Sequence, residues 1–411
     1  MKKTLRVFEA FAGIGAQHKV IQKLNDSNNL KFKVVGTSDW DARSNIVYSI
    51  LHHGMTLENV KSFFKNRPDL KKNLNELVLK KGFSLNSKTL AKNMKMKDEL
   101  FKESLVYSNV LSNNHPNIKD INGDLINKLK VDLLTYSFPC QGLSVANMGR
   151  DKGILNEEST SHLVWEIERI LKDCKNKPKI LILENVRQLV LKYKDQYEQW
   201  KSSLKKLGYK TFTAILTASE HGSLQKRQRV YAISIPKNWK TPFKQNDLDY
   251  EKYLIQKGSE RAILNREEQL KEYLRIYDLD NRYFKESKWS SIKMTKSRLK
   301  YKDGKQITRE PESYLINTLT TRQDRYPNNG IIKFKKGNPH MSDYRLITPR
   351  EAYKIMGFED SDYEKLIPFI KKGILTKESL YRQAGNSIDV KPLQSVFETA
   401  YDIFELNGGN K

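Results

Sequence analysis

A cysteine follows an apolar-leaning run that is expected to be a strand. Cys140 comes after VDLLTYSF and Pro139, and the chain has one other cysteine, Cys174. A strand there would place the thiol at its carboxyl end, where open α/β sheets bind their ligands. A free cysteine is more often an inert buried side chain, but the flanking letters SFP and QGLS offer little to a core. We therefore interpret Cys140 as a nucleophile.

Two later strands are expected to bring charged groups to this thiol. Glu184 ends the apolar run KILILENV, and a carboxyl in a partly desolvated site can act as an acid, although a structural hydrogen-bond acceptor is the alternative. Arg227 and Arg229 occupy alternate positions just before the expected strand in QKRQRVYAISI, so they should point the same way. In a basic chain they fit a phosphate or base contact better than a charged strand edge.

The segment FEAFAGIGAQ combines a strand, a tight glycine turn and the start of a helix. Gly13 and Gly15 let backbone amides approach a ligand, although such glycines can also shape a simple connection. The next strand ends in SDW, where Asp39 can accept hydrogen bonds from ribose and Trp40 can lie against a purine. The turn lacks the lysine and hydroxyl of a P-loop, so we expect an adenosine cofactor without a triphosphate.

These groups fit one reaction. Carbon 5 of cytosine is a poor nucleophile, but a thiolate that adds to carbon 6 makes it an enamine carbon that can attack an activated methyl group. An acid that hydrogen-bonds to ring N3 assists this addition. The reaction needs a cysteine, a carboxyl near N3 and N4, an arginine near O2 and a methyl donor that carries adenosine.

The composition favours a polyanionic partner. The 411 residues include 74 Lys and Arg against 48 Asp and Glu, a formal charge of +26, which favours nucleic acid over a merely basic surface. Two cysteines cannot form a disulfide framework or a CxxC zinc site, and this fits a reducing cytoplasm. No apolar run approaches the ~18 residues that span a membrane. We expect a cytoplasmic protein with neither a membrane contact nor a metal.

Short β-rich runs alternate with helix-length segments in the first part of the chain, which predicts a doubly wound α/β sheet of the Rossmann-like kind. We expect residues 1–236 to form a catalytic and cofactor-binding domain and 237–343 a smaller inserted domain. Residues 344–411 should end in a helix that returns to the first domain. We interpret the lysine-rich helical segment 51–114 as a solvated surface.

The ordered motifs resemble those of the DNA (cytosine-5) methyltransferase family over nearly the whole chain. FEAFAGIGA is similar to the S-adenosylmethionine turn, SDW to the ribose and adenine contacts, and KDI at 119–121 to the segment along the adenine edge. SFPCQ resembles the nucleophile loop, LENV the acid motif and QKRQR the QxRxR motif, while RLITPREAYKIMGF and QAGNSI resemble the ninth and tenth motifs. FEAFAGIGAQ and TYSFPCQ are most similar to the mollicute enzymes that methylate CpG.

The resemblance implies an S-adenosylmethionine-dependent methyltransferase in which 237–343 is the target-recognition domain. It implies that Cys140 is the nucleophile, Glu184 the N3 and N4 partner, and Arg229 the O2 contact, with Arg227 nearer a phosphate. The loop 141–158 would close over double-stranded DNA once the target base is flipped out. The cofactor would be lined by Phe11, Gly13, Ile14, Gly15, Asp39, Trp40, Asp120, Ile121, Pro139, Leu163, Asn386 and Ser387.

Two segments bear on the loop and on the target. ESTSHLVWEIERIL lacks the arginine and glycine that the family usually has before Leu163. In the recognition segment, Thr318 and Leu319 resemble a common Thr-Leu pair, and Gln323 is among the polar side chains after it that can read base edges. A charged loop that touches only phosphate is the alternative. The expected DNA contacts are Gln141, Ser144, Arg227, Thr318, Arg322, Asp324 and Arg325.

Three functions remain open from the sequence. The first is a monomeric DNA cytosine methyltransferase of a restriction-modification system or mobile element, with a cognate restriction endonuclease as candidate partner. The second is a tRNA cytosine-5 methyltransferase on the same fold, against which the long recognition segment argues. The third is a non-catalytic DNA-binding relative, which would be expected to lose Cys140 or Glu184, whereas both are present.

Overall fold

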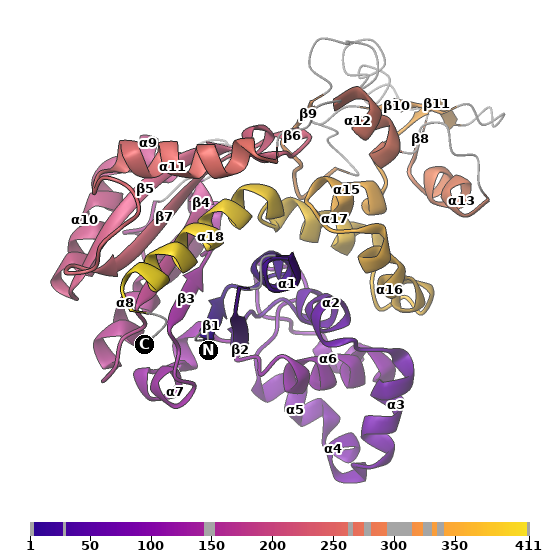
Figure 1. Ribbon diagram of the computed structural model, residues 1–411. Helices are drawn as coiled ribbons and strands as arrows, with labels where there is room; N and C mark the ends of the chain where they lie inside the picture. The colour runs from indigo at the N-terminus through magenta and orange to yellow at the C-terminus, as the bar shows by residue number, and fades with distance from the viewer. Residues whose placement is uncertain are drawn as a thin grey trace. The chain divides into compact units, whose positions relative to one another are not determined.

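The computed structural model describes residues 4–27, 30–143, 153–261, 266–274, 281–293, 315–323, 331–334 and 341–408. The chain forms two compact units (Figure 1). Unit 1 comprises Met1–Leu216, Gln228–Gln256 and Leu393–Lys411, and unit 2 comprises Thr217–Arg227 and Lys257–Pro392. The boundary expected at residue 237 therefore falls inside unit 1. Residues 344–392, which were expected to follow the recognition domain as a separate segment, belong to unit 2.

A six-stranded sheet forms the centre of unit 1, in the order β2-β1-β3-β4-β7-β5. Four strands, β1 to β4, pair in parallel, and β7 pairs antiparallel with β4. This mostly parallel order confirms the predicted Rossmann-like α/β class. The strands are β1 (Leu5–Ala10), β2 (Phe32–Ser38), β3 (Leu133–Tyr136), β4 (Ile180–Val186), β5 (Tyr209–Thr217) and β7 (Gln228–Pro236).

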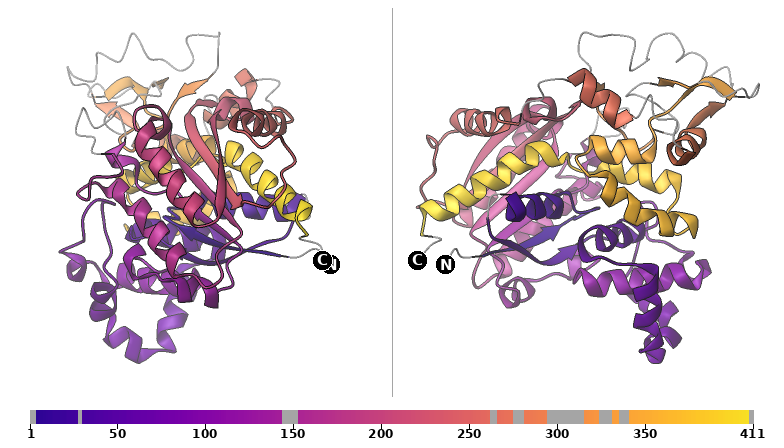
Figure 2. Two further views of the ribbon diagram at one scale, coloured as in Figure 1. Left: turned by 90° about the vertical axis from the view of Figure 1, so that its left-hand side faces the viewer. Right: turned by 45° about the vertical axis from the view of Figure 1, so that its right-hand side comes forward.

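Helices cover both faces of this sheet (Figures 1 and 2). On one face, Phe32 of β2 contacts Phe397 and Tyr401 of the last helix. The other face carries an apolar core in which Phe8 and Leu183 pack with Trp200. The helices around the sheet are α1 (Ala16–Ser27), α2 (Ala42–His53), α7 (Gly123–Lys128), α8 (Val164–Asp173), α9 (Gln188–Leu191), α10 (Lys194–Lys206), α11 (Asp247–Ser259) and α18 (Val390–Leu406).

The lysine-rich segment after α2 folds as a helical insertion, which projects from the sheet in Figure 1. Its longest helix packs on α2. Lys71 forms ion pairs with Glu99 at 2.7 Å and with Glu103 at 3.2 Å, which join two of its helices. The elements are α3 (Leu57–Lys65), α4 (Pro68–Lys72), α5 (Leu74–Lys80), η1 (Met94–Met96) and α6 (Glu99–Leu111), followed by η2 (Ile118–Asp120).

Unit 2 combines small sheets with helices. The strands β10, β11 and β8 form one antiparallel sheet, and β6 and β9 form a parallel pair. The elements are η6 (Ala218–His221), β6 (Gln225–Lys226), α12 (Arg266–Leu274), α13 (Asn281–Trp289), β8 (Ser291–Lys293), β9 (Ile316–Asn317), β10 (Ile332–Lys333), β11 (Met341–Arg345), α15 (Pro349–Ile355), α16 (Asp360–Lys371) and α17 (Lys377–Asn386).

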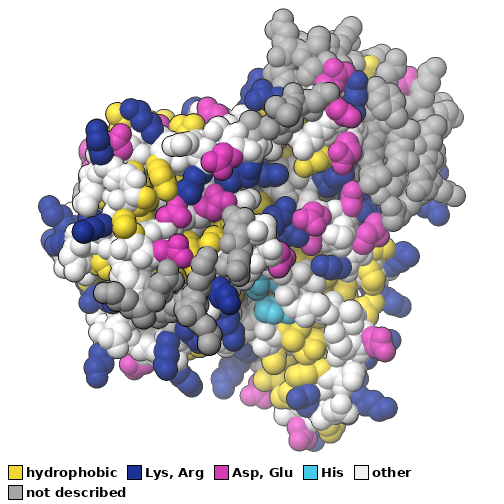
Figure 3. Space-filling model, viewed as in Figure 1, with side chains coloured by type: hydrophobic (Ala, Val, Ile, Leu, Met, Phe, Trp, Pro, Cys, Tyr) yellow, Lys and Arg dark blue, Asp and Glu magenta, His cyan; other side chains and the backbone are white. Residues whose placement is uncertain are grey.

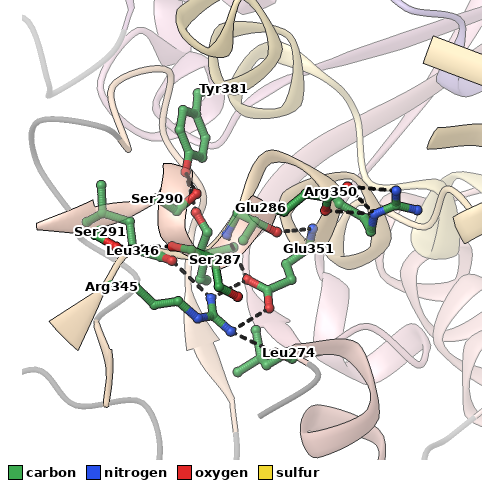
Figure 4. Close-up of polar contacts among 12 residues, drawn as sticks. Leu274, Glu286, Ser287, Ser290, Ser291, Arg345, Leu346, Arg350, Glu351 and Tyr381 are labelled. Atoms are coloured by element: carbon green, nitrogen blue, oxygen red, sulfur yellow. Dashed lines mark hydrogen bonds and ion pairs between the residues drawn. The ribbon is translucent and has the colours of Figure 1, made fainter. Parts of the chain in front are cut away.

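Buried arginines join the elements of unit 2 (Figure 4). The guanidinium of Arg345, 2% exposed, donates to both carboxylate oxygens of Glu351 at 2.8 Å. It also donates to the carbonyls of Leu274 and Leu346 at 2.9 and 3.1 Å. Arg350 is equally buried and pairs with Glu286 of α13 at 2.8 Å. Buried charges require such partners, so these contacts hold α12, α13 and β11 against α15.

Arg345→Met should destabilise unit 2, because it leaves the buried Glu351 carboxylate without its bidentate partner. Breaking a buried pair from one side costs about 3–5 kcal/mol. Urea unfolding combined with hydrogen exchange of α15 measures the loss. Lys365→Met is the control, since Lys365 is half-exposed and lies 3.6 Å from Asp362, and such pairs contribute about 1 kcal/mol or less. Equal losses in the two variants would contradict the role of the buried pair.

Candidate active site

The loop that carries Cys140 leaves the carboxyl end of β3 beside β4. Tyr136, the last residue of β3, pairs with Leu183, so the loop begins next to Glu184. Phe138 is buried, whereas Cys140 is partly exposed at the start of η3 (Cys140–Gly142). The side chain of Asn185 donates to the carbonyl of Phe138 at 3.0 Å. The loop and the acid strand are therefore fixed to each other by a direct hydrogen bond.

Ser161 gives this loop a second attachment. It lies in η5 (Thr160–Leu163) and is fully buried. Its hydroxyl donates to the carbonyl of Pro139 at 2.6 Å and accepts the backbone N–H of Gly142 at 3.1 Å. A Cβ added at Gly142 would lie 2.0 Å from the hydroxyl of Ser159. Ser161 thus anchors the chain on both sides of Cys140. Ser161 itself belongs to ESTSHLVWEIERIL, the segment that lacks the arginine and glycine usual in the family.

Glu184 and Arg229 lie together on the next two strands. In the antiparallel pairing of β4 with β7, Glu184 is opposite Tyr231 and Val186 is opposite Arg229. This diagonal arrangement places both charged groups on one face, with 3.4 Å between Nε of Arg229 and Oε1 of Glu184. Because β7 runs antiparallel to β4, its start lies at the same sheet edge as the Cys140 loop. The structure therefore gathers the three predicted catalytic side chains at one edge.

Arg227 lies just before β7, and its side chain contacts other segments of unit 2. It lies between β6 and β7 and belongs to unit 2, whereas Arg229 belongs to unit 1. Its side chain is 3% exposed. The guanidinium donates to the carbonyls of Leu319, Gly385 and Ser387 at 3.2, 3.3 and 2.8 Å. In the structure Arg227 joins the QxRxR motif to the Thr-Leu pair and to the tenth motif.

A buried carboxyl supports the same junction of unit 2. Asp389 is fully buried and accepts hydrogen bonds from Ser223 at 2.6 Å and from Gln225 at 2.8 Å. Gln225 is the first residue of QKRQR, Ser223 lies two residues before it, and Asp389 follows QAGNSI. Sequence reasoning missed this contact, because nothing in the two motifs shows that they meet. The QxRxR motif is therefore fixed at both its glutamine and its first arginine.

The glycine turn after β1 is shaped by its backbone and by Asp39. Phe11, Gly13 and Gly15 all have positive φ angles, of 58°, 56° and 79°. A Cβ at Gly15 would lie 2.3 Å from the His52 side chain, so only glycine fits there. The carboxylate of Asp39 accepts the N–H of Gly13 at 2.8 Å. Asp39 thus holds the end of β2 against the turn.

The side chain of Asp39 is well placed for a hydroxylated ligand. It accepts a second hydrogen bond from the N–H of Asp41, and Asn114 holds its backbone N–H at 3.0 Å. Burial and the nearby Asp41 carboxylate raise the pKa of Asp39. Trp40 and Phe11 are both partly exposed, and Phe11 also packs against the apolar core. A carboxyl acceptor, two aromatic side chains and a tight glycine turn fit the adenosine part of S-adenosylmethionine.

The other expected cofactor residues divide between the units. Ile14 and Ile121 are buried, and Pro139 and Leu163 are partly buried. Asp120 is exposed and accepts a hydrogen bond from Asn117 at 3.0 Å. These residues belong to unit 1, whereas Asn386, exposed, and Ser387, buried, belong to unit 2.

The expected DNA contacts are described only in part. Ser144, Asp324 and Arg325 lie outside the described residues. Gln141 is partly buried and Arg322 is exposed. Thr318 donates to the carbonyl of Lys226 at 3.0 Å. Gln323, expected among the base-reading side chains, is 2% exposed and donates to Thr320 at 3.4 Å.

A buried cluster beneath the glycine turn was missed from the sequence. Glu9 of β1 is fully buried, and its Oε2 accepts a hydrogen bond from the Tyr48 hydroxyl at 2.7 Å. That hydroxyl also contacts Nδ1 of His18 at 2.7 Å, and His18 stacks on His52. Burial raises the pKa of Glu9 to about 8, although the hydrogen bond from Tyr48 opposes the shift. Glu9 is thus kept protonated at neutral pH below the turn.

Comparison with known proteins places the chain in a family. The family described as C-5 cytosine-specific DNA methylase matches residues 84–402. The orphan methyltransferase M.SssI of Spiroplasma monobiae is 32% identical over 415 residues, covering 96% of this chain and 97% of that protein. The type II methyltransferase M2.ScrFI of Lactococcus lactis subsp. cremoris is 32% identical over 411 residues, with 97% and 99% covered. The chain belongs to the C-5 cytosine-specific DNA methylase family, which confirms the resemblance seen in the motifs.

Solved structures support the fold. The Dnmt2 methyltransferase of S. pombe matches with a TM-score of 0.62 at 18% identity, and covers 98% of each chain. The methyltransferase EhMeth of Entamoeba histolytica matches with a TM-score of 0.58 at 19% identity and the same coverage. Among the described residues, no helix is both long and apolar enough to cross a membrane.

The buried Glu9 predicts a pH dependence of stability. Its ordinary pKa is 4.5 and its pKa in the folded protein is about 8, so between these values the folded state holds more protons than the unfolded state. The free energy of unfolding should therefore fall as pH rises from about 5 to 8. Glu9→Gln should flatten this fall in urea unfolding at a series of pH values. Glu58→Gln, at an exposed position, should keep the wild-type slope, and a wild-type slope in Glu9→Gln would refute the assignment.

Ser161→Ala should slow methyl transfer, because the Cys140 loop loses both of its bonds to the Ser161 hydroxyl. Displacement of a reacting group by about 1 Å can reduce the rate by about 100-fold, so we expect a fall in kcat of about 10- to 100-fold. Cofactor affinity should change little. Ser203→Ala is the control, since Ser203 is buried and its hydroxyl has no hydrogen-bond partner among the described residues. A wild-type kcat in Ser161→Ala would exclude the anchoring role.

Proposed function

We propose that this protein transfers a methyl group from S-adenosylmethionine to carbon 5 of a flipped-out cytosine in a specific sequence of duplex DNA. The observation that carries the proposal is the meeting of Cys140, Glu184 and Arg229 at one sheet edge, with 3.4 Å between the two charged groups. Family membership supports the reaction, and the related M2.ScrFI is named a type II methyltransferase. The formal charge of +26 supports a polyanionic substrate.

The arrangement of Glu184 and Arg229 matches one edge of cytosine. That edge presents O2, N3 and the N4 amino group in a row. The guanidinium of Arg229 donates to O2, while Glu184, protonated, donates to N3 and accepts from N4. These interactions withdraw electrons from the ring and stabilise the negative charge that would otherwise build up on it. Glu184 on β4 and Arg229 on β7 are neighbours, and in this proposal they bind the same edge of the cytosine together.

Cys140 performs the covalent step. Its thiolate sulfur forms a bond to carbon 6, and the electron pair of the C5–C6 double bond moves to carbon 5. S-Adenosylmethionine, when bound, supplies the electrophilic methyl group that carbon 5 takes up. The proton on carbon 5 then leaves to a base, the C5–C6 double bond forms again, and the sulfur departs as thiolate. The bonds from Asn185 and Ser161 keep the sulfur at a fixed position through both halves of the reaction.

The cofactor is assigned to the carboxyl edge of β1 and β2. Asp39 would accept the ribose hydroxyls, Trp40 and Phe11 would contact the adenine, and Asp120 with Ile121 would border its edge. Gly13 and Gly15 leave room for the amino-acid part of the molecule. Pro139 and Leu163 in unit 1, and Asn386 and Ser387 in unit 2, complete the proposed set.

Arg227 is assigned a positioning role rather than contact with the substrate. Its donors bind carbonyls of unit 2, so its charge fixes the segment next to Arg229. The remaining DNA contacts proposed are Gln141, Ser144, Thr318, Arg322, Asp324 and Arg325. We further propose that the protein acts as a cytoplasmic monomer in a restriction-modification system or mobile element, with a cognate restriction endonuclease as partner.

Cys140→Ala should abolish methyl transfer to plasmid DNA, measured by bisulfite sequencing, while cofactor and DNA binding persist. The same sequencing of wild-type product identifies the target sequence. Cys174→Ala is the matched control and should retain turnover, because Cys174 is 5% exposed and packs in the core of unit 1. DNA made with 5-fluorocytosine should trap an adduct, since fluorine cannot leave as the proton does. Retained turnover in Cys140→Ala, or an adduct mapped to Cys174, would overturn the mechanism.

A further inference from the structure

The helical insertion contains a stretch that has no acidic residue. The lysine segment, from Leu77 to Lys97, has six lysines and no Asp or Glu: Lys80, Lys81, Lys88, Lys92, Lys95 and Lys97. Lys97 is half-buried and the others are exposed. The adjoining helices balance their charges through the pairs of Lys71 with Glu99 and Glu103. The lysine segment therefore contains no acidic side chain that could offset its positive charge.

The lysine segment is attached to the cofactor strand. The N–H of Ser84 donates to the carbonyl of Trp40 at 2.8 Å, and the N–H of Ala42 donates to the carbonyl of Ser84 at 2.9 Å. The hydroxyl of Ser87 donates to Asp41 at 2.6 Å. These bonds fix the segment at the carboxyl end of β2.

The turn that presents Lys88 is internally braced. Asn86 accepts the backbone N–H groups of Lys88 and Thr89 at 2.9 and 3.0 Å. The hydroxyl of Ser84 donates to the carbonyl of Thr89 at 2.7 Å. Phe83 and Met94 are buried on either side of the turn. A braced loop loses little conformational entropy on binding, so the lysines are displayed in a form suited to a ligand rather than on a loose tail.

This position relates the lysine segment to the catalytic edge. Strands β2, β1 and β3 are neighbours and run parallel, so the carboxyl ends of β2 and β3 lie at one sheet edge. Two strand spacings of about 4.8 Å place the attachment of the lysine segment about 10 Å from β3, the strand that leads into the Cys140 loop. Duplex DNA carries one negative charge per about 1.7 Å of its axis. A duplex held at Cys140 therefore has phosphates within the reach of this segment.

We propose that the lysine segment is a second DNA contact, which binds backbone phosphates of the duplex beside the target base. This inference rests on the proposed function for its placement of DNA at Cys140. It replaces the interpretation of the insertion as a solvated surface. Figure 3 shows an apolar patch over the insertion, bordered by both basic and acidic side chains. Leu90 and Met96 are 60% and 86% exposed, so an apolar protein partner is the alternative that the experiment separates.

The experiment measures how DNA affinity depends on salt. The variant Lys88→Gln/Lys92→Gln/Lys95→Gln is compared with wild type on a labelled non-cognate duplex of about 30 base pairs, over a series of KCl concentrations. Each phosphate contact contributes about 0.9 to the slope of log affinity against log salt, so the slope should weaken by about 2 to 3. The control Lys61→Gln/Lys65→Gln/Lys72→Gln removes the same charge from exposed positions on α3 and α4. Its slope should change by less than about 1.

The outcomes separate the proposal from its alternatives. Equal slopes in the two triple variants would show that only net charge matters and would overturn the proposal. An unchanged slope in the Lys88 variant, the result expected for a surface that docks a protein, would also overturn it. Cofactor affinity should be that of wild type, and a loss would indicate that the segment at Trp40, after β2, is disturbed instead. The experiment uses a non-cognate duplex and measures binding alone, so the slopes test the lysine segment whether or not the protein methylates DNA. A separate assay in which the wild type methylates no DNA would refute the proposed function.

Discussion

The parallel pairing of β3 with β4 is the constraint from which the site follows. With Tyr136 opposite Leu183, the Cys140 loop must leave the sheet next to Glu184, and the antiparallel β7 then returns Arg229 to the same edge. Backbone hydrogen bonds thus decide the spacing of groups that belong to three separate motifs. Asn185 and Ser161 add side-chain bonds to a placement that the sheet has already determined.

A second constraint acts where charge is buried. Glu9 in unit 1 and Arg345, Arg350 and Asp389 in unit 2 are almost entirely removed from water. Glu9 responds by holding its proton, whereas the two arginines keep their charge and are matched by carboxylates. These are the two ways in which a buried ionisable group avoids the cost of desolvation. Each fixes its neighbours, because a displaced partner would leave the group unsatisfied.

The parts of the site that could be predicted are those that a local sequence pattern indicates. Apolar runs ending in Cys140 or Glu184 indicate strand ends, and parallel strands bring such ends together. The partners of Arg227 were not visible in the alternation of the two arginines, because they lie in the Thr-Leu pair and in the tenth motif. The partners of Glu9, Ser161 and Asp389 depend on contacts between distant segments, such as Ser223 with Asp389. Nothing local marks these residues. The insertion's charge was visible, but its attachment to Trp40 was not.

The contrasting settings of the two cysteines have a practical consequence. Cys174 is packed in the core of unit 1, and burial raises the pKa of its thiol to about 11. Cys140 is partly exposed at the end of its strand. Because thiolates are the reactive form, a thiol-directed fluorophore applied to the native protein would attach at a single position, inside the catalytic edge. The unmodified chain therefore offers a single position for a spectroscopic label, at the edge where the proposed base and cofactor would bind.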